Sequence, residues 1–146
     1  MSTTSRSYLL VAVQILALFY LFISGPVIPT NILVGILMIG GVMLGLWSVY
    51  AFRGTTFKIT PELPENATHI ISGPYGIIRH PMYASVMLVA LALLANFFSF
   101  ERMIALIILF VNFHMKITHE ESLLEKRFGE YKTYKQKTHR LLPFIY

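Results

Sequence analysis

Four long runs of apolar residues dominate this sequence and point to a membrane protein. They span residues 8–23, 32–52, 83–100 and 103–116. A helix needs about 20 apolar residues to cross the hydrocarbon core of a bilayer, and the second run meets this length. The fourth run is short, but Lys116 at its end can extend its ammonium to the interface while the helix continues. The predicted fold is therefore all-α, a polytopic membrane bundle of about four transmembrane helices.

The composition supports this interpretation. Hydrophobic residues make up 55% of the 146 residues and charged residues 13%, whereas a soluble domain carries about 25% charged residues. The length fits a single domain, residues 1–146, in which the tail at 117–146 forms a C-terminal amphipathic helix. The sequence contains no Cys, which excludes disulfides and thiolate metal sites.

The basic residues indicate how the chain is oriented in the membrane. If the N-terminus is cytosolic, eleven of the twelve Lys and Arg residues lie on the cytosolic side, and only Arg102 lies outside. This asymmetry follows the positive-inside rule. We therefore expect a multi-pass protein whose termini, loop at 53–80 and tail are all cytosolic. No groove-reading motif accompanies the basic residues, so we expect no nucleic-acid partner.

The first cluster of chemically distinctive residues is the segment Arg79-His80-Pro81-Met82-Tyr83, where the loop enters the third run. Proline is favoured in the first turn of a helix, so Pro81 is expected to begin the third helix. The unpaired amides and the dipole at a helix start attract anions. Tyr83 follows His80 by about one turn and shares its face. The segment predicts a cradle for a carboxylate; the alternative is a set of ordinary interfacial side chains.

The second cluster follows the fourth run and contains two adjacent carboxylates, Glu120 and Glu121. Ionisable groups near the bilayer are costly and are often functional. Glutamate can accept hydrogen bonds from a ribose or an amine, and Arg127 can hold a carboxylate with two parallel hydrogen bonds. Gly129 is expected to end the helix. The alternative is an interfacial amphipathic helix whose charged face is solvated.

Other features predict packing rather than chemistry. Gly41 and Gly45 have the spacing that brings helices close together, and their face also allows a homodimer. Asn112 is expected to form a hydrogen bond with a neighbouring helix. Runs three and four are separated by Glu101 and Arg102, which predicts a tight helical hairpin. No metal site is expected, because the histidines are scattered along the chain.

Taken in order, these motifs resemble the signature of the isoprenylcysteine carboxyl methyltransferase family, and phospholipid N-methyltransferases are similar in the same region. The resemblance covers residues 72–143 and closes with Arg140 and Pro143. Members often have glycine where this chain has Ser85. The resemblance implies a cytosol-facing pocket for S-adenosylmethionine, which the C-terminal tail covers and which opens sideways to a lipid-like acceptor.

The resemblance also implies roles for individual residues. Those implied in cofactor binding are His80, Pro81, Tyr83, Glu120 and Glu121. Arg127 and Glu121 would be catalytic, with Arg127 binding the acceptor. A carboxylate acceptor is ionised at neutral pH and needs no base, so Arg127 would position it. An amine acceptor would need Glu120 or Glu121 as a base.

Three enzymatic functions stay open at this point. The first is carboxyl O-methylation of an isoprenylcysteine-like acid, and the second is N-methylation of a phospholipid amine. The third is an NADPH-dependent reaction of the sterol-reductase type, because residues 143–146 resemble those enzymes, although Met82 replaces their usual Asn. A non-catalytic membrane scaffold is disfavoured, because the paired carboxylates lie on the same predicted membrane side as His80.

Overall fold

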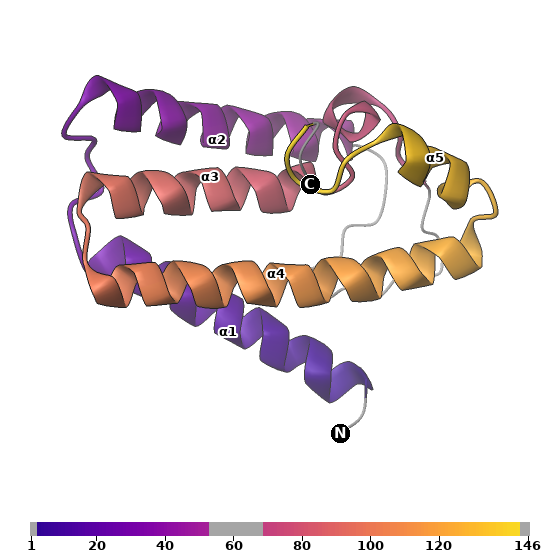
Figure 1. Ribbon diagram of the computed structural model, residues 1–146, viewed down its shortest axis with the longest axis horizontal. Coiled ribbons are helices and arrows are strands. Elements are labelled where there is room, and N and C mark those ends of the chain that lie inside the picture. The colour runs from indigo at the N-terminus through magenta and orange to yellow at the C-terminus, as the bar shows by residue number, and fades with distance from the viewer. Residues whose placement is uncertain (1–2, 53–68, 144–146) are drawn as a thin grey trace.

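The computed structural model describes residues 3–52 and 69–143. The described ranges leave out residues 53–68, which are much of the predicted cytosolic loop. They also leave out residues 144–146, which belong to the segment that resembles the sterol-reductase-type enzymes. The helices in the described part are α1 (Thr3–Ile23), α2 (Ile32–Ala51), the 3₁₀ helix η1 (Gly73–Gly76), α3 (Pro81–Asn96), α4 (Phe100–Arg127) and α5 (Tyr131–Lys137) (Figure 1). Apart from these helices, this part of the chain contains an isolated β-bridge, so the all-α prediction is confirmed for it.

The helices α2, α3 and α4 lie side by side, and α1 crosses α4 at an angle (Figure 1). α2 runs along α3, α3 lies beside α4, and α1 packs against α4. Leu21, Leu93, Leu109 and Phe113 are fully buried where α1, α3 and α4 meet. The outer faces of α1 and α2 expose many large apolar side chains, a pattern expected of helices that contact lipid.

Two glycines of α2 allow α3 to approach closely. A Cβ atom on Gly41 would lie 2.9 Å from the Cγ2 atom of Val89, and one on Gly45 would lie 2.8 Å from the Oγ atom of Ser85. The close helix packing that the glycine spacing predicted therefore occurs, and it occurs within the chain. A homodimer through this face would have to displace α3.

The hairpin between α3 and α4 turns earlier than the sequence suggested. α3 ends at Asn96, and Ser99 caps α4 by accepting a hydrogen bond from the amide of Arg102 at 3.3 Å. Glu101 and Arg102 therefore lie in the first turn of α4 and not in the connection. Arg102 is fully buried. Its guanidinium donates hydrogen bonds to the carbonyls of Leu21, at 3.0 Å, and Leu93, at 2.6 Å, and these bonds offset the cost of removing the charge from water.

Asn96 fixes the connection between α1 and α2 at the same end of the molecule. Its side-chain oxygen accepts hydrogen bonds from the amide and the hydroxyl of Thr30, at 2.7 and 2.8 Å. Its side-chain nitrogen donates to the carbonyls of Pro26 and Ile28, both at 2.8 Å. One amide side chain thus satisfies backbone groups of a proline-containing loop, and the loop is held against α3.

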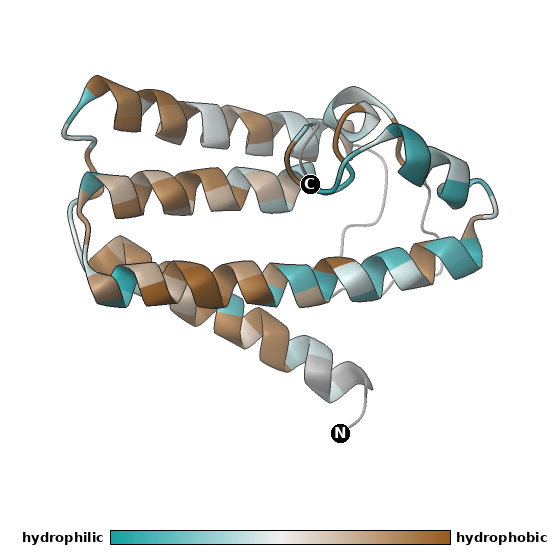
Figure 2. Ribbon diagram, in the orientation of Figure 1, coloured by the Kyte–Doolittle hydropathy of each residue, from teal (hydrophilic) through white to brown (hydrophobic). Residues whose placement is uncertain are grey.

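α4 is one continuous helix that joins the predicted fourth span to the predicted tail helix. It contains 28 residues, and its second half is visibly more polar than its first (Figure 2). The amphipathic helix expected in the tail from residue 117 is mostly the second half of α4, which ends before Gly129 as predicted. The expectation that Lys116 reaches an interface is wrong. This residue is 1% exposed, because Gln14 of α1 supplies a hydrogen-bond acceptor inside the bundle.

Among the described helices, α2 is long and apolar enough to cross a membrane. The apolar stretches of α1 and α3 are shorter, at Ser7–Ile23 and Pro81–Asn96. The third helix begins at Pro81, as predicted, because proline is accommodated at the first helical position, and it ends at Asn96 rather than at residue 100. The described helices thus include one clear candidate for a membrane span, α2, and two shorter apolar helices, of which α3 packs against α2 and α1 packs against α4.

Candidate active site

The C-terminal segment lies against the start of α3 and joins the two sequence motifs. Ile78 and His139 form a parallel β-bridge. The amide of Arg79 donates to the carbonyl of His139 at 2.7 Å, and the amide of His80 donates to the carbonyl of Arg140 at 3.1 Å. These bonds satisfy backbone groups just before α3 begins, so the tail is fixed beside the first motif.

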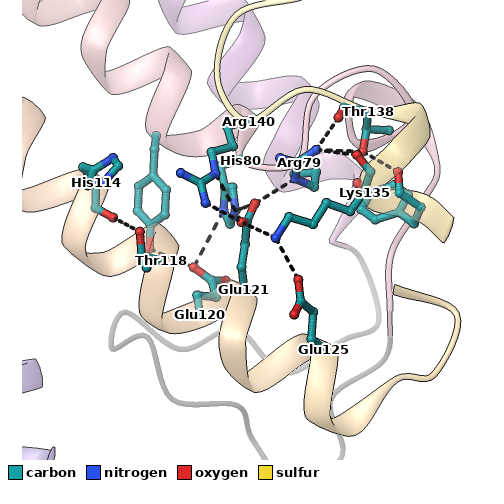
Figure 3. A network of polar contacts seen from close by, with 12 residues as sticks. Arg79, His80, His114, Thr118, Glu120, Glu121, Glu125, Lys135, Thr138 and Arg140 are labelled. Atoms are coloured by element: carbon teal, nitrogen blue, oxygen red, sulfur yellow. Dashed lines mark hydrogen bonds and ion pairs between the residues drawn. The ribbon is translucent and has the colours of Figure 1, made fainter. Parts of the chain in front are cut away.

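Glu121 is the centre of a buried ionic network (Figure 3). It is 2% exposed, and its Oε1 atom accepts a hydrogen bond from Arg79 Nε at 2.7 Å. Its Oε2 atom accepts one from Arg140 Nη2 at 3.0 Å and lies 3.6 Å from Lys135 Nζ. Burial by itself raises the pKa of Glu121, but the hydrogen bonds and charges of His80 and Arg79 outweigh burial and hold the pKa well below its usual range. Glu121 therefore stays ionised and joins α4 to the start of α3 and to the tail.

Arg79 extends this network to the end of α5. Its Nη1 atom donates to the carbonyl of Lys135 at 3.1 Å and to the carbonyl of Thr138. The sequence placed Arg79 in a predicted carboxylate cradle, where the structure puts the carboxylate of Glu121, but it gave Arg140 no role. The sequence feature that could have indicated these arginines is Glu121 itself, because a buried carboxylate requires cationic partners.

Glu120 lies beside Glu121 in the sequence but faces different groups. Its side chain is 28% exposed, and its Oε2 atom accepts a hydrogen bond from the hydroxyl of Tyr83 at 3.2 Å. The same oxygen lies 3.8 Å from His80 Nδ1, and the His80 ring stacks on Tyr83 with centroids 5.7 Å apart. Pro81 is buried at the first position of α3 and fixes where this helix begins. The structure thus gathers all five residues to which the resemblance gave a cofactor role.

Arg127 lies apart from this cluster. It is the last residue of α4 and is exposed, with its guanidinium carbon 5.9 Å from the centre of the Phe128 ring. It follows Glu121 by six residues, which corresponds to about 9 Å along a helix. The two residues to which the resemblance gave a catalytic role are therefore separated along α4.

An apolar cavity of about 530 Å³ lies beside the ionic network. α2, η1, α3, α4 and the tail all line it, with side chains that include Trp47, Leu88 and Phe110. Ile78 and Leu141 also line it, and their chain neighbours are the two arginines that bind Glu121. The cavity lining is itself apolar, and the cavity approaches the ionic network through these two chain segments.

A second group of rings surrounds His69, a residue that sequence reasoning did not identify because it belongs to no motif. Its ring centre lies 5.5 Å from that of Phe128, 5.2 Å from Tyr131 and 4.6 Å from Tyr134. Tyr131 is 1% exposed, and burial raises its pKa well above the usual range, so its hydroxyl keeps its proton. Within the described part of the chain this hydroxyl has no hydrogen-bond partner. Buried polar groups are nearly always paired, so the hydroxyl is a candidate to bind a ligand group or a water molecule.

Comparisons with known proteins connect these features to a family. A family model described as phospholipid methyltransferase matches residues 30–131. The chain is 35% identical over 118 residues to a probable protein-S-isoprenylcysteine O-methyltransferase of Oryza sativa subsp. indica, and equally to one of Oryza sativa subsp. japonica. These alignments cover 77% of this chain and 61% of each relative, so the chain spans about three fifths of the relatives' length. The region matched by the family model contains the Glu pair and its partners Arg79, His80 and Tyr83 at the start of α3, and it ends before Arg140.

Proposed function

The chain belongs to the phospholipid methyltransferase family, and on this basis we propose that it is an integral membrane enzyme that transfers a methyl group from S-adenosylmethionine to a lipid. The family model covers more than half of the chain, which confirms the family resemblance drawn from the motifs. The same match favours methyl transfer over the NADPH-dependent alternative.

The observation that carries this proposal is the apolar cavity whose lining residues Ile78 and Leu141 adjoin, in the chain, the two arginines that bind Glu121. A lipid acceptor needs an apolar space for its chain and a polar boundary for its head group. The cavity volume of about 530 Å³ lies within the usual range for small-molecule sites, roughly 300–1,000 Å³. We therefore assign the cavity to the acceptor chain and the neighbouring ionic network to the head group.

The residues around Glu120 fit S-adenosylmethionine as the cofactor. S-adenosylmethionine supplies a methyl group on a positively charged sulfur, which is an excellent donor. Glu120 is partly exposed and can accept hydrogen bonds from the cofactor's amine or ribose, while the buried hydroxyl of Tyr131 can meet a further polar group. His80 and Tyr83 hold Glu120 in place, and Pro81 fixes the start of α3. These residues contribute placement and a water-poor pocket, which methyl transfer requires.

We propose a carboxylate as the acceptor, as in an isoprenylcysteine-like acid. The name of the two relatives, protein-S-isoprenylcysteine O-methyltransferase, supports this class, and a carboxylate is ionised at neutral pH and needs no base. Two guanidinium groups are candidates to position it: Arg127 at the exposed end of α4, and Arg140 next to the cavity wall. The geometry favours Arg140, with Glu121 holding its guanidinium in place.

An amine of a phospholipid is the second candidate acceptor. The description of the family model supports it, and so does the partly exposed carboxylate of Glu120. An amine must lose a proton before it attacks, and Glu120 is better placed than the buried Glu121 to take it.

The proposed topology has four membrane helices with both termini and the site in the cytosol. The apolar outer faces of α1 and α2 support it, and so does the change from apolar to polar along α4 (Figure 2). The eleven-to-one distribution of Lys and Arg supplies the orientation.

Binding and turnover of the purified protein test the proposal. In detergent, calorimetry should detect S-adenosylmethionine binding and no NADPH binding. Methyl transfer should then be measured with a prenylated cysteine that carries a carboxylate, its methyl ester, and phosphatidylethanolamine. Transfer to the acid alone supports the carboxylate acceptor, and transfer to the phospholipid supports the amine. NADPH binding without S-adenosylmethionine binding would overturn the proposed function.

A further inference from the structure

A second polar contact lies inside the bundle, one turn before the Glu pair, and joins α1 to α4. Gln14 is the amide that interrupts the first apolar run. The ammonium of Lys116 donates to the side-chain oxygen of Gln14 at 2.7 Å, and Lys116 is 1% exposed. The two residues are 102 positions apart in the chain, so the contact exists only in the folded protein.

Helix association does not require a charge at this interface. Asn112 already donates its side-chain amide to the carbonyl of Leu10 at 2.9 Å, one turn earlier on both helices. Neutral hydrogen bonds of this kind commonly join helices in lipid. An ammonium costs far more to bury than an amide does. A lysine at position 116 therefore indicates a function beyond holding α1 to α4.

The charge of Lys116 is directed at the proposed cofactor site. Its ammonium lies 5.3 Å from the centre of the Tyr83 ring, which is a cation–π distance. The hydroxyl of Tyr83 donates a hydrogen bond to Glu120, and the His80 ring stacks on the Tyr83 ring. Lys116 and Glu120 are four residues apart on α4 and so share a face. A positive charge behind Tyr83 makes its hydroxyl a better donor to the carboxylate.

We propose that Gln14 and Lys116 are positioning residues of the cofactor site: Gln14 holds the ammonium of Lys116 against Tyr83, and this charge fixes the carboxylate of Glu120. The inference rests on the proposed function, because Tyr83 and Glu120 are the residues proposed to bind the cofactor. α1, which carries none of the family motifs, is then part of the site.

Three variants test this coupling by measuring cofactor affinity and stability separately. Lys116→Met removes the charge and Gln14→Leu removes its partner, while the control Asn112→Leu removes the neutral contact at the same interface. All three should lower the unfolding temperature in detergent. Lys116→Met and Gln14→Leu should also weaken S-adenosylmethionine binding by about threefold to tenfold, and Asn112→Leu should leave it within about twofold.

Conservative variants keep the test decisive if the first set does not fold. Lys116→Arg retains the cation and Gln14→Glu retains the acceptor, so both should keep most of the affinity. Unchanged affinity in Lys116→Met and Gln14→Leu, while the wild-type protein binds, would overturn the coupling alone. Affinity losses of equal size in all three main variants would also overturn it. Absence of binding by the wild-type protein would overturn the proposed function and this role with it.

Discussion

Replacing Glu121 and Glu120 one at a time with glutamine should separate two functions that adjacent carboxylates carry. Glu121 is buried and binds Arg79 and Arg140. Glu120 is partly exposed and accepts a hydrogen bond from Tyr83. We expect Glu121→Gln to reduce stability chiefly and Glu120→Gln to reduce cofactor affinity chiefly.

The magnitudes follow from burial. Removing one charge of a buried ion pair leaves its partner uncompensated, which costs about 3–5 kcal/mol. For Glu120→Gln, the new side chain is partly exposed and can still accept from Tyr83, so the free energy of unfolding should fall by less than about 1 kcal/mol. Loss of a charge-assisted hydrogen bond to the cofactor should cost about 1.5–3 kcal/mol, which is at least a tenfold change in affinity.

Thermal unfolding in detergent and calorimetry with S-adenosylmethionine measure the two quantities. The pH adds a check, because the pKa of Glu121 is held below its usual range. Its stabilising contribution is therefore fully present above the unfolded-state pKa of about 4.3 and is lost as the pH falls towards the depressed value. The stability difference between wild type and Glu121→Gln should shrink accordingly below about pH 4. A Glu121→Gln protein as stable as wild type at neutral pH would refute this reasoning.

Three further outcomes are expected. Arg140→Lys should lower turnover with a carboxylate acceptor more than tenfold, because misplacement of the acceptor by about 1 Å can cost on the order of 100-fold in rate. Arg127→Lys should change turnover less than about threefold, and the reverse order would restore Arg127 as the positioning residue. Tyr131→Phe should keep or raise the unfolding temperature, since the buried hydroxyl that it removes has no hydrogen-bond partner among the described residues. It should also weaken S-adenosylmethionine binding; unchanged binding would leave the hydroxyl outside the site. Reporters fused after residue 146 and within the turn at 97–99 should give opposite membrane sides.

Local sequence rules predicted the features of this fold that depend on neighbouring residues. Pro81 begins α3, and the helix that contains the Glu pair ends before Gly129. The four-residue spacing of Gly41 and Gly45 predicted close packing, because it places both glycines on the same face of one helix. Such features need only the periodicity of a helix and the preferences of its ends.

The pairing of charges could not be predicted in this way. Arg79 and Arg140 meet Glu121 from 42 and 19 residues away, and Lys116 meets Gln14 from 102 residues away. A single sequence shows that charges need partners, but it does not show which ones the tertiary structure provides. The six-residue spacing of Glu121 and Arg127 was visible in the sequence, but the partners that gather around Glu121 alone came from the tertiary structure.

Because α4 is continuous, the direction in which the Glu pair points depends on the number of residues between it and the packed part of the helix. With 28 residues, α4 is about 42 Å long, longer than the hydrocarbon core of a bilayer at about 30 Å. Its first half packs against α1 and α3 inside the bundle, and its second half carries the Glu pair. One inserted residue between these halves would rotate the carboxylates by about 100° relative to the packed face, whereas seven would nearly restore their direction. Length changes in this stretch are therefore tolerable only when they preserve the rotation, even if every side chain of the site is unchanged.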